Sequence, residues 1–225
     1  MKQDCSHDDM LFVSPAHVRV WLHWAREHCS WTPEQCGHAL FTDESRFNIQ
    51  NDYRIAMIWR EPGTRYWAPN VVERDNYRGG GLLVWAGIAT NDRTDLYMFA
   101  GGSVTAVRYR DEILHPLVRT FIAAMGTEAI FIDDNARPHR ARLVRSNLKV
   151  ENIPQIAWPA RSPDPNPIEH VWFMLGRRTA GRSVPLGTLH ELQQALLQEW
   201  ASLPQQAIND TIASLPRRCQ ACISA

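Results

Sequence analysis

The sequence predicts an α/β protein in which a mixed sheet is flanked by helices, with further helices at the C-terminus. Residues 38–50 alternate between apolar and polar positions, as a half-buried strand does. Residues 129–132 form a short run of β-branched and aromatic side chains, which is typical of a buried strand. Strands and helices then alternate through the second half of the chain. Antiparallel strands followed by β-α-β-α units indicate a mixed sheet.

The N-terminal region predicts two helices after a short lead-in. Residues 1–15 show no periodic pattern, so we expect them to be a lead-in. Apolar residues recur at helical spacing over residues 17–30, and Thr32 followed by Pro33 predicts the start of a second helix.

The strand at residues 38–50 places a carboxylate in an unusual position. Alternation puts Asp43 on the more apolar face with Phe41 and Phe47, while Glu44 shares the polar face with Arg46. A carboxylate on a buried face is costly unless hydrogen bonds, a cation or a metal ion compensates it. Asp43 is therefore a candidate functional residue. The alternative is that it lies at a frayed end of the sheet and faces water.

The middle of the chain predicts three strands and a helix. The turns between them are rich in glycine and proline. The strands are expected at residues 54–60, 81–89 and 96–100, and the helix is expected from Ser103 or Thr105 to Gly126.

A second and a third carboxylate come from the stretch that follows. The strand at 129–134 ends in Asp133 and Asp134, where open α/β sheets place their ligands. A helix at about 138–150 and a strand at 153–158 lead to a proline-rich turn, and further helices are predicted at 188–203 and 205–215.

Glu169 lies at the start of another predicted helix. Asn166 is a good N-cap and Pro167 suits the first helical position. The alternative for Glu169 alone is the acidic half of a capping pair with Asn166. Residues 135–168 separate Asp134 from Glu169, a gap of 34 residues.

The totals describe an ordinary soluble globular protein. The chain has 225 residues, 44% hydrophobic and 21% charged. Its longest apolar run, residues 81–89, is far shorter than the ~20 residues that span a bilayer, so no membrane association is expected. The N-terminus lacks the apolar core of a signal peptide, and five cysteines argue against a disulfide framework. Cys219 and Cys222 have the spacing of half a zinc site, but no suitable second pair accompanies them, so zinc is not expected.

The basic residues are almost all arginine. Formal net charge is +0, and only Lys2 and Lys149 are lysines among the 24 lysine and arginine residues. Arginine suits phosphate recognition through its bidentate fork. A genomic bias in base composition explains the same excess equally well.

Three sequence blocks resemble the signature blocks of the Tc1/mariner superfamily of transposases, in its Tc1-like branch. They read FTDESRF at residues 41–47, DNARPH at 134–139 and SPDPNPIEHVW at 162–172. Their order and the 34-residue gap match the family's pattern, and the resemblance covers about residues 15–222.

The resemblance implies an RNase H-like fold with a five-stranded mixed sheet and extra C-terminal helices. It also implies a DDE-type enzyme that performs metal-dependent DNA strand cleavage and strand transfer. Asp43, Asp134 and Glu169 match the acidic triad that holds two Mg²⁺ ions, for which Mn²⁺ can substitute. Asp133 competes for the role of Asp134, but the Asp-Asn match and the gap favour Asp134.

The implied partner is double-stranded DNA, both transposon ends and TA target sites, bound by a homodimer in the nucleus. His139 and His170 lie within the blocks, where they are candidates for assisting at the phosphate or pairing with the triad. The alternative for both is an ordinary surface or core histidine.

The sequence also departs from the family's pattern. About 15 residues precede the catalytic part, so the N-terminal helix-turn-helix region is expected to be absent and residues 16–225 to form the catalytic domain. Pro165 stands where the family usually has an apolar residue, and Phe173 stands where aspartate is common. A catalytically inactive or host-adopted remnant that binds DNA or partner subunits is therefore the alternative function. An RNase H-like nuclease or resolvase outside transposition is disfavoured by the block at 166–170.

Overall fold

The computed structural model describes residues 15–49, 81–101, 103–159 and 166–224. The strand predicted at 54–60 and the departure at Pro165 lie outside these described residues. None of the described helices is long and apolar enough to cross a membrane.

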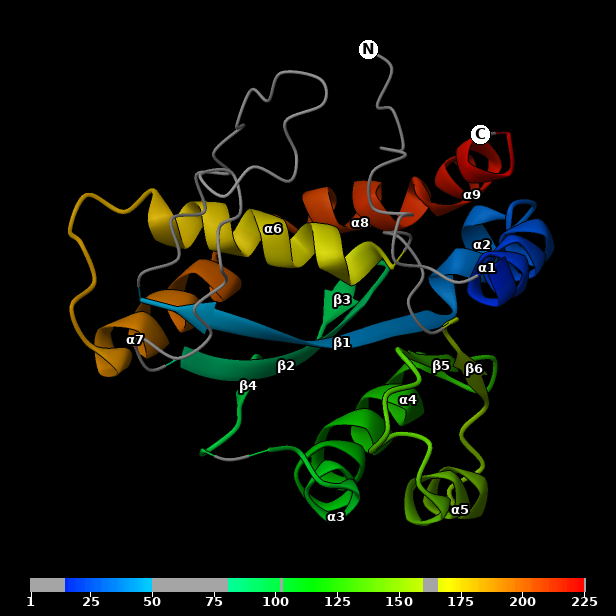
Figure 1. Cartoon of the computed structure of the whole chain (residues 1–225), viewed down its shortest axis with the longest axis horizontal. Coiled ribbons are helices and arrows are strands. Elements are labelled where there is room, and N and C mark those ends of the chain that lie inside the picture. Colours follow the sequence, from blue (N-terminus) through cyan, green and yellow to red (C-terminus); the bar gives the residue numbers. More distant parts are fainter. Residues whose placement is uncertain (1–14, 50–80, 102, 160–165, 225) are drawn as a thin grey trace.

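A mixed sheet forms the centre of the molecule (Figure 1). Its order is β3-β2-β1-β5-β6; β1 runs antiparallel to β2 and parallel to β5, and β5 runs parallel to β6. The short strands β3 and β4 both pair with β2 on its side away from β1, so the sheet formed by the described residues has six strands but is five wide. The predicted mixed sheet is thus confirmed. The strands are β1 (Ala39–Asn48), β2 (Gly81–Ala89), β3 (Asp92–Arg93), β4 (Tyr97–Met98), β5 (Ile130–Asp133) and β6 (Gln155–Ala157).

Helices cover both faces of the sheet. One layer contains α1 (Pro15–His28), α2 (Pro33–Gly37), α6 (Pro167–Ala180), α7 (Leu189–Ala201), α8 (Gln205–Ala213) and α9 (Leu215–Ile223). The other contains α3 (Ala106–Arg108), the π-helical η3 (Tyr109–Val118), α4 (Arg119–Met125) and α5 (Arg142–Val150). Figure 1 shows α6, α8 and α9 on one side of the strands and α3, α4 and α5 on the other.

Alternation along β1 explains why two separate cores form. Phe41 and Phe47 are buried in the core beneath α6–α9, whereas Leu40 is buried in the core beneath η3, α4 and α5. Since neighbouring residues of a strand point to opposite faces, a strand between two helical layers needs apolar residues on both. The faces predicted for residues 39–49 are confirmed.

Three helical segments differ from the prediction. The helix predicted from 103–105 to Gly126 is continuous but widens to a π-helix over η3, which contains Pro116, a residue with no N–H to donate. Helix α5 begins at Arg142, later than expected, because residues 137–140 form a turn. Helix α9 was not predicted; Pro216 lies in its first turn, where proline is well tolerated.

Candidate active site

The parallel pairing of β1 with β5 sets the distance between two of the predicted acids. Phe41 of β1 pairs with Ile132 of β5. The same register, continued for two residues, brings Asp43 opposite Asp134 just beyond the end of β5. Neighbouring strands lie ~4.8 Å apart. The two aspartates therefore reach the same end of the sheet at the same level.

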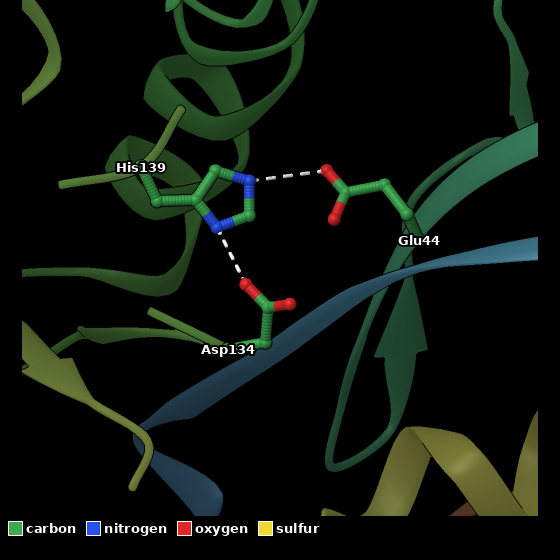
Figure 2. Close-up of side chains that lie close together, drawn as sticks. All are labelled: Glu44, Asp134 and His139. Atoms are coloured by element: carbon green, nitrogen blue, oxygen red, sulfur yellow. Dashed lines mark hydrogen bonds and ion pairs between the residues drawn. The ribbon is translucent and has the colours of Figure 1, made fainter. Parts of the chain in front are cut away.

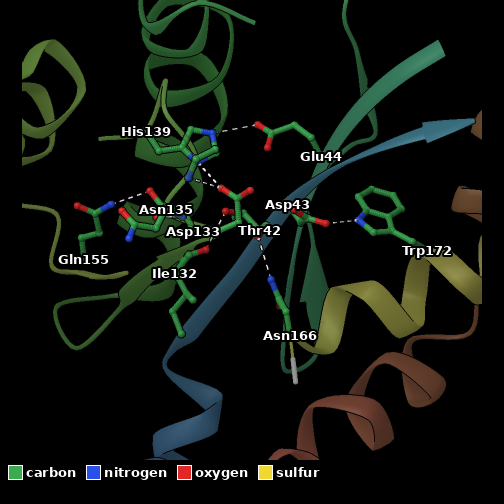
Figure 3. A network of polar contacts seen from close by, with 12 residues as sticks. Thr42, Asp43, Glu44, Ile132, Asp133, Asn135, His139, Gln155, Asn166 and Trp172 are labelled. Atoms are coloured by element: carbon green, nitrogen blue, oxygen red, sulfur yellow. Dashed lines mark hydrogen bonds and ion pairs between the residues drawn. The ribbon is translucent and has the colours of Figure 1, made fainter. Parts of the chain in front are cut away.

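Helix α6 brings the third acid to this end of the sheet. Asn166 caps the helix by accepting from the Ile168 N–H, and its Nδ2 donates to the Thr42 carbonyl of β1 at 3.4 Å. Trp172 Nε1 donates to Asp43 Oδ2 at 3.1 Å (Figure 3). Glu169 lies three residues before Trp172, one helical turn away on the same side. The helix start is thus anchored next to Asp43.

The pKa of Asp43 reflects burial and negative charge around its carboxyl group. Burial raises the pKa of the Asp43 carboxyl well above its usual range, and the negative charges of Glu44, Asp134 and Glu169 raise it further. Each of these three carboxylates therefore acts on Asp43 through space. A cation placed among them relieves this repulsion.

Adjacent aspartates at the end of β5 differ in their surroundings. Asp133 is 1% exposed; its Oδ1 accepts from the Asn135 N–H at 3.1 Å and its Oδ2 from Gln155 Nε2 at 2.6 Å (Figure 3). The Asp134 side chain is 39% exposed, and its Oδ1 accepts from the Ala136 N–H at 2.9 Å. Asp133 therefore uses both oxygens within the fold, while the contacts of Asp134 with other described residues involve its Oδ1.

A histidine joins Asp134 to a fourth acid. His139 Nδ1 lies 2.7 Å from Asp134 Oδ1, and its Nε2 lies 3.2 Å from Glu44 Oε1 (Figure 2). The histidine side chain is 2% exposed. Among the described residues, these three form the one group of histidine, cysteine or acidic side chains with ligand atoms all within 4.8 Å. Asp43 and Glu169 are outside this compact group.

Charge pairing dominates the pKa values within the group. Burial lowers the pKa of His139, but hydrogen bonds and charge from Asp134 and Glu44 outweigh it and raise the value to about 10. Burial raises the pKa of Asp134, yet His139 and the Ala136 N–H bring it below its ordinary value. Burial also raises the pKa of Glu44, and His139 only partly offsets that effect. At neutral pH the geometry favours a cationic His139 between two carboxylates.

The donor set at this edge suits a hard divalent cation. Carboxylate oxygens converge from β1, the end of β5 and α6, and Mg²⁺ is usually held by a few carboxylates together with water and substrate phosphate. A cation held at such a site would stabilise negative charge on phosphoryl oxygens, which favours reactions of phosphate esters.

Sequence reasoning missed three contributors to this site. Glu44 was interpreted only as part of a polar face, Trp172 only as a member of the third sequence block, and Asn166 as a cap. Each also makes a contact with a residue distant in sequence, to His139, Asp43 and Thr42 respectively. Only the tertiary pairing reveals these contacts. His170 is half-buried on α6 and lies outside the compact group.

Comparisons with known proteins agree with this geometry. Residues 38–192 match the family model of the DDE superfamily endonucleases. The chain is 31% identical over 215 residues to the transposable element Tcb1 transposase of Caenorhabditis briggsae, covering 95% of this chain and 77% of the relative.

The fold has solved counterparts. The catalytic domain of Mos1 mariner transposase superposes with a TM-score of 0.69 at 15% identity, over 94% of each chain. A Mos1 mariner paired-end complex with Mn matches with a TM-score of 0.73 at 18% identity, over 94% of this chain and 63% of that one. The fold is therefore RNase H-like, as in these catalytic domains. With its family match over most of its length and its Tcb1 relative, the chain belongs to the DDE superfamily endonucleases, within the Tc1/mariner superfamily of transposases.

Proposed function

We propose that this chain cleaves DNA strands and transfers them, with Asp43, Asp134 and Glu169 holding two divalent cations, Mg²⁺ or Mn²⁺ in its place. The observation that carries the proposal is that three acids, from β1, the end of β5 and α6, lie at the same end of the sheet. The solved Mos1 mariner paired-end complex with Mn supports this choice of ion.

The two-ion arrangement does not require all three acids to form one compact group. Paired ions in such sites lie ~3.5–4 Å apart. Mg²⁺ binds oxygen at ~2.1 Å. Asp43, Asp134 and Glu169 would hold such a pair of ions between them, and acids that share two ions would spread further than the 4.8 Å that limits the group around His139.

The chain's own residues orient the acids before substrate arrives. Trp172 holds Asp43 through Oδ2, and Asn166 fixes the start of α6 against β1. When bound, paired cations activate the attacking oxygen and stabilise the leaving oxygen of an in-line phosphoryl displacement. The attacking group is water in cleavage and a DNA 3′-hydroxyl in transfer, so no serine, tyrosine or cysteine nucleophile is required.

The wider biological setting follows from the family. We propose transposon ends and TA target sites in double-stranded DNA as partners, a homodimer as the DNA-bound form, the nucleus as the location and residues 16–225 as the catalytic unit. Solved Mos1 complexes include one with a left transposon end and a strand transfer complex, which supports DNA as the partner class.

The experiment uses the full chain with Mn²⁺, a duplex ending in a free 3′-hydroxyl and a supercoiled plasmid as target. Wild type is expected to join the duplex to the plasmid, and Asp134→Asn to give no product above background. In parallel, Mn²⁺ at 100 times its Kd is expected to stabilise the wild-type fold by ~2.7 kcal/mol, and Asp134→Asn not at all. Equal products from both proteins would refute catalysis by these acids. A melting curve of wild type that ignores Mn²⁺ favours an inactive remnant instead.

A further inference from the structure

The two ring nitrogens of His139 each contact a different carboxylate. Nδ1 lies 2.7 Å from Asp134 and Nε2 lies 3.2 Å from Glu44, on opposite sides of the ring (Figure 2). Glu44 belongs to β1, Asp134 follows β5 and His139 sits in the turn before α5. The contact thus links three segments. Nε2 is hydrogen-bonded to Glu44, and the Nδ1 contact with Asp134 is an ion pair whose angle falls outside hydrogen-bond geometry. A carboxylate at each nitrogen favours the ring with a hydrogen on both nitrogens.

The ring of His139 is held in place from a third direction. The fully buried Tyr109 of η3 packs against it, with ring centroids 4.1 Å apart and an interplanar angle of 32°. Asn135 takes a left-handed conformation at φ 59°, which turns the chain sharply after Asp134 and brings His139 back toward it. The position of the ring is therefore fixed by packing and by the turn.

The contact decides which oxygen of Asp134 is left for a ligand. His139 and the Ala136 N–H both engage Oδ1. These two contacts fix the carboxylate plane, and within the described part of the chain they leave Oδ2 for a ligand. Residues that donate to a metal-binding side chain from outside the metal site hold it in its binding orientation, and they contribute strongly to affinity.

Glu44 has a different place from the three acids of the proposed site. It follows Asp43 on β1, so its side chain points to the opposite face of the sheet. In Figure 3, Asp43 is directed to Trp172 while Glu44 is directed to His139. This position suits an anchor for the imidazole better than a direct ligand shared with Glu169.

We propose that Glu44 and His139 are positioning residues that hold Asp134 in its cation-binding orientation. The inference rests on the proposed function, in which Asp134 is a cation ligand. Glu44 fixes the far nitrogen of the ring, Tyr109 fixes its plane, and the near nitrogen fixes the Asp134 carboxylate. Neither Glu44 nor His139 contacts the cation.

The experiment measures Mn²⁺ binding by calorimetry on the full chain without DNA, so the readout is independent of activity. His139→Gln is expected to weaken Mn²⁺ binding by ~10–100-fold. Glu44→Gln is expected to weaken it by a smaller factor, because the amide oxygen still accepts from the ring. His115→Gln is the matched control: His115 pairs with Asn147 away from the site, and its variant is expected to bind Mn²⁺ as wild type does.

Several outcomes overturn the inference. Unchanged or tighter binding in His139→Gln shows that the ring competes with the cation or does not act on it. A loss in Glu44→Gln as large as that in Asp134→Asn shows that Glu44 is itself a ligand. If His139→Gln does not fold, unchanged Mn²⁺ binding in Glu44→Gln contradicts the inference instead. Wild-type affinity in Asp134→Asn refutes the proposed cation site itself, which is a separate failure.

Discussion

At the scale of single residues, Asp133 and Asp134 show how one step along the chain changes the chemistry of a carboxylate. Burial raises the pKa of Asp133, whereas the contact with His139 helps to bring that of Asp134 below its ordinary value. Asp133 joins β5 to β6 through Gln155. Asp133 is therefore a structural carboxylate, and its neighbour Asp134 is a candidate cation ligand. Experiments that measure stability and cation binding independently can distinguish the two roles.

Asp133→Asn is expected to lower stability and leave cation binding intact. Its two oxygens accept from Asn135 and Gln155, and an amide replaces one acceptor with a donor. Leaving a buried hydrogen-bonding group unsatisfied costs ~1–3 kcal/mol. Urea unfolding and Mn²⁺ calorimetry on the same protein check both parts. If Asp133→Asn keeps full stability but loses Mn²⁺ binding, Asp133 is the cation ligand, and the roles assigned to Asp133 and Asp134 are wrong.

Asp43 makes the cation-free protein less stable as pH rises. Its pKa is higher in the folded than in the unfolded chain, so its contribution is complete below the ordinary value near 3.8 and declines as pH rises through the raised value. Asp43→Asn removes that decline and can still accept from Trp172 Nε1. We therefore expect the variant to melt at a higher temperature than wild type at pH 8 in EDTA, with the difference closing toward pH 4.

The chain length sets how far a change in stability shifts the melting temperature. For a domain of this size, a difference of ~1 kcal/mol moves the melting temperature by ~2–4 °C. Melting curves at pH 4, 6 and 8 with and without Mg²⁺ provide the test, and added Mg²⁺ is expected to stabilise wild type alone. A variant that is less stable than wild type at pH 8 would contradict repulsion among Asp43, Glu44, Asp134 and Glu169.

Local patterns singled out each acid as a candidate and the family resemblance joined them into a triad, but neither predicted how their neighbours hold them. Asp43 was identified because alternation put a carboxylate on an apolar face, and the structure places it there beside Trp172. The contact between Glu44 and His139 joins residues 95 positions apart. Such a contact depends on strand pairing and on the turn after Asp134, and no local pattern encodes it.

At the scale of elements, the start of α6 combines two functions in one side chain. Asn166 caps the helix and also donates to the Thr42 carbonyl, and it is 2% exposed. The cap was predicted from Asn166 and Pro167 because helix starts have local signals. The start of α5 was predicted too early, because the turn that carries His139 is closed by its own backbone bonds, from the Arg140 N–H to Ala136 and from the Ala141 N–H to Pro138.

Asn166→Ala is expected to reduce both stability and cation binding. Loss of an N-cap costs ~0.5–2 kcal/mol. Losing the bond to Thr42 also frees the segment that places Glu169 beside Asp43. Thermal unfolding with and without Mn²⁺ measures both effects.

Thr188→Ala provides the matched control for this helix. Thr188 caps α7 with a capping box, and the side-chain hydrogen bonds of that box involve Glu191 and no residue of the candidate site. Its substitution is expected to cost a similar amount of stability while keeping the stabilisation by Mn²⁺. If both variants keep that stabilisation, the anchoring of α6 has no part in cation binding.

At the scale of the whole molecule, a formal net charge of +0 conceals an uneven distribution. From Asn135 to Val150 the chain has five arginine or lysine residues and no acid. All five are exposed, and none forms an ion pair with a residue that the structure describes. This basic segment begins directly after Asp134. The five residues are Arg137, Arg140, Arg142, Arg145 and Lys149.

Helix α5 turns part of this segment into one continuous basic face. Successive helical residues are ~100° apart, so Arg142, Arg145 and Lys149 fall within an arc of ~60°. Val144 and Leu148 are buried on the other side of the helix. Sequence composition alone left the arginine excess ambiguous between phosphate recognition and genomic bias. The common face and the absence of ion pairs within the described part of the chain favour contact with phosphate.

Replacing Arg142, Arg145 and Lys149 with glutamine is therefore expected to weaken duplex DNA binding and to reduce its salt dependence. Each phosphate contact contributes ~0.9 to the slope of log K against log salt, so the slope should fall by up to ~2.7. Fluorescence anisotropy between 50 and 200 mM NaCl, with Ca²⁺ to prevent cleavage, measures it. Arg178 and Arg182 are the control, because Glu199 already pairs with both. Their glutamine variants should keep the wild-type slope. An equal fall of the slope in both sets of variants would mean that DNA binding depends on the overall charge rather than on this face of α5.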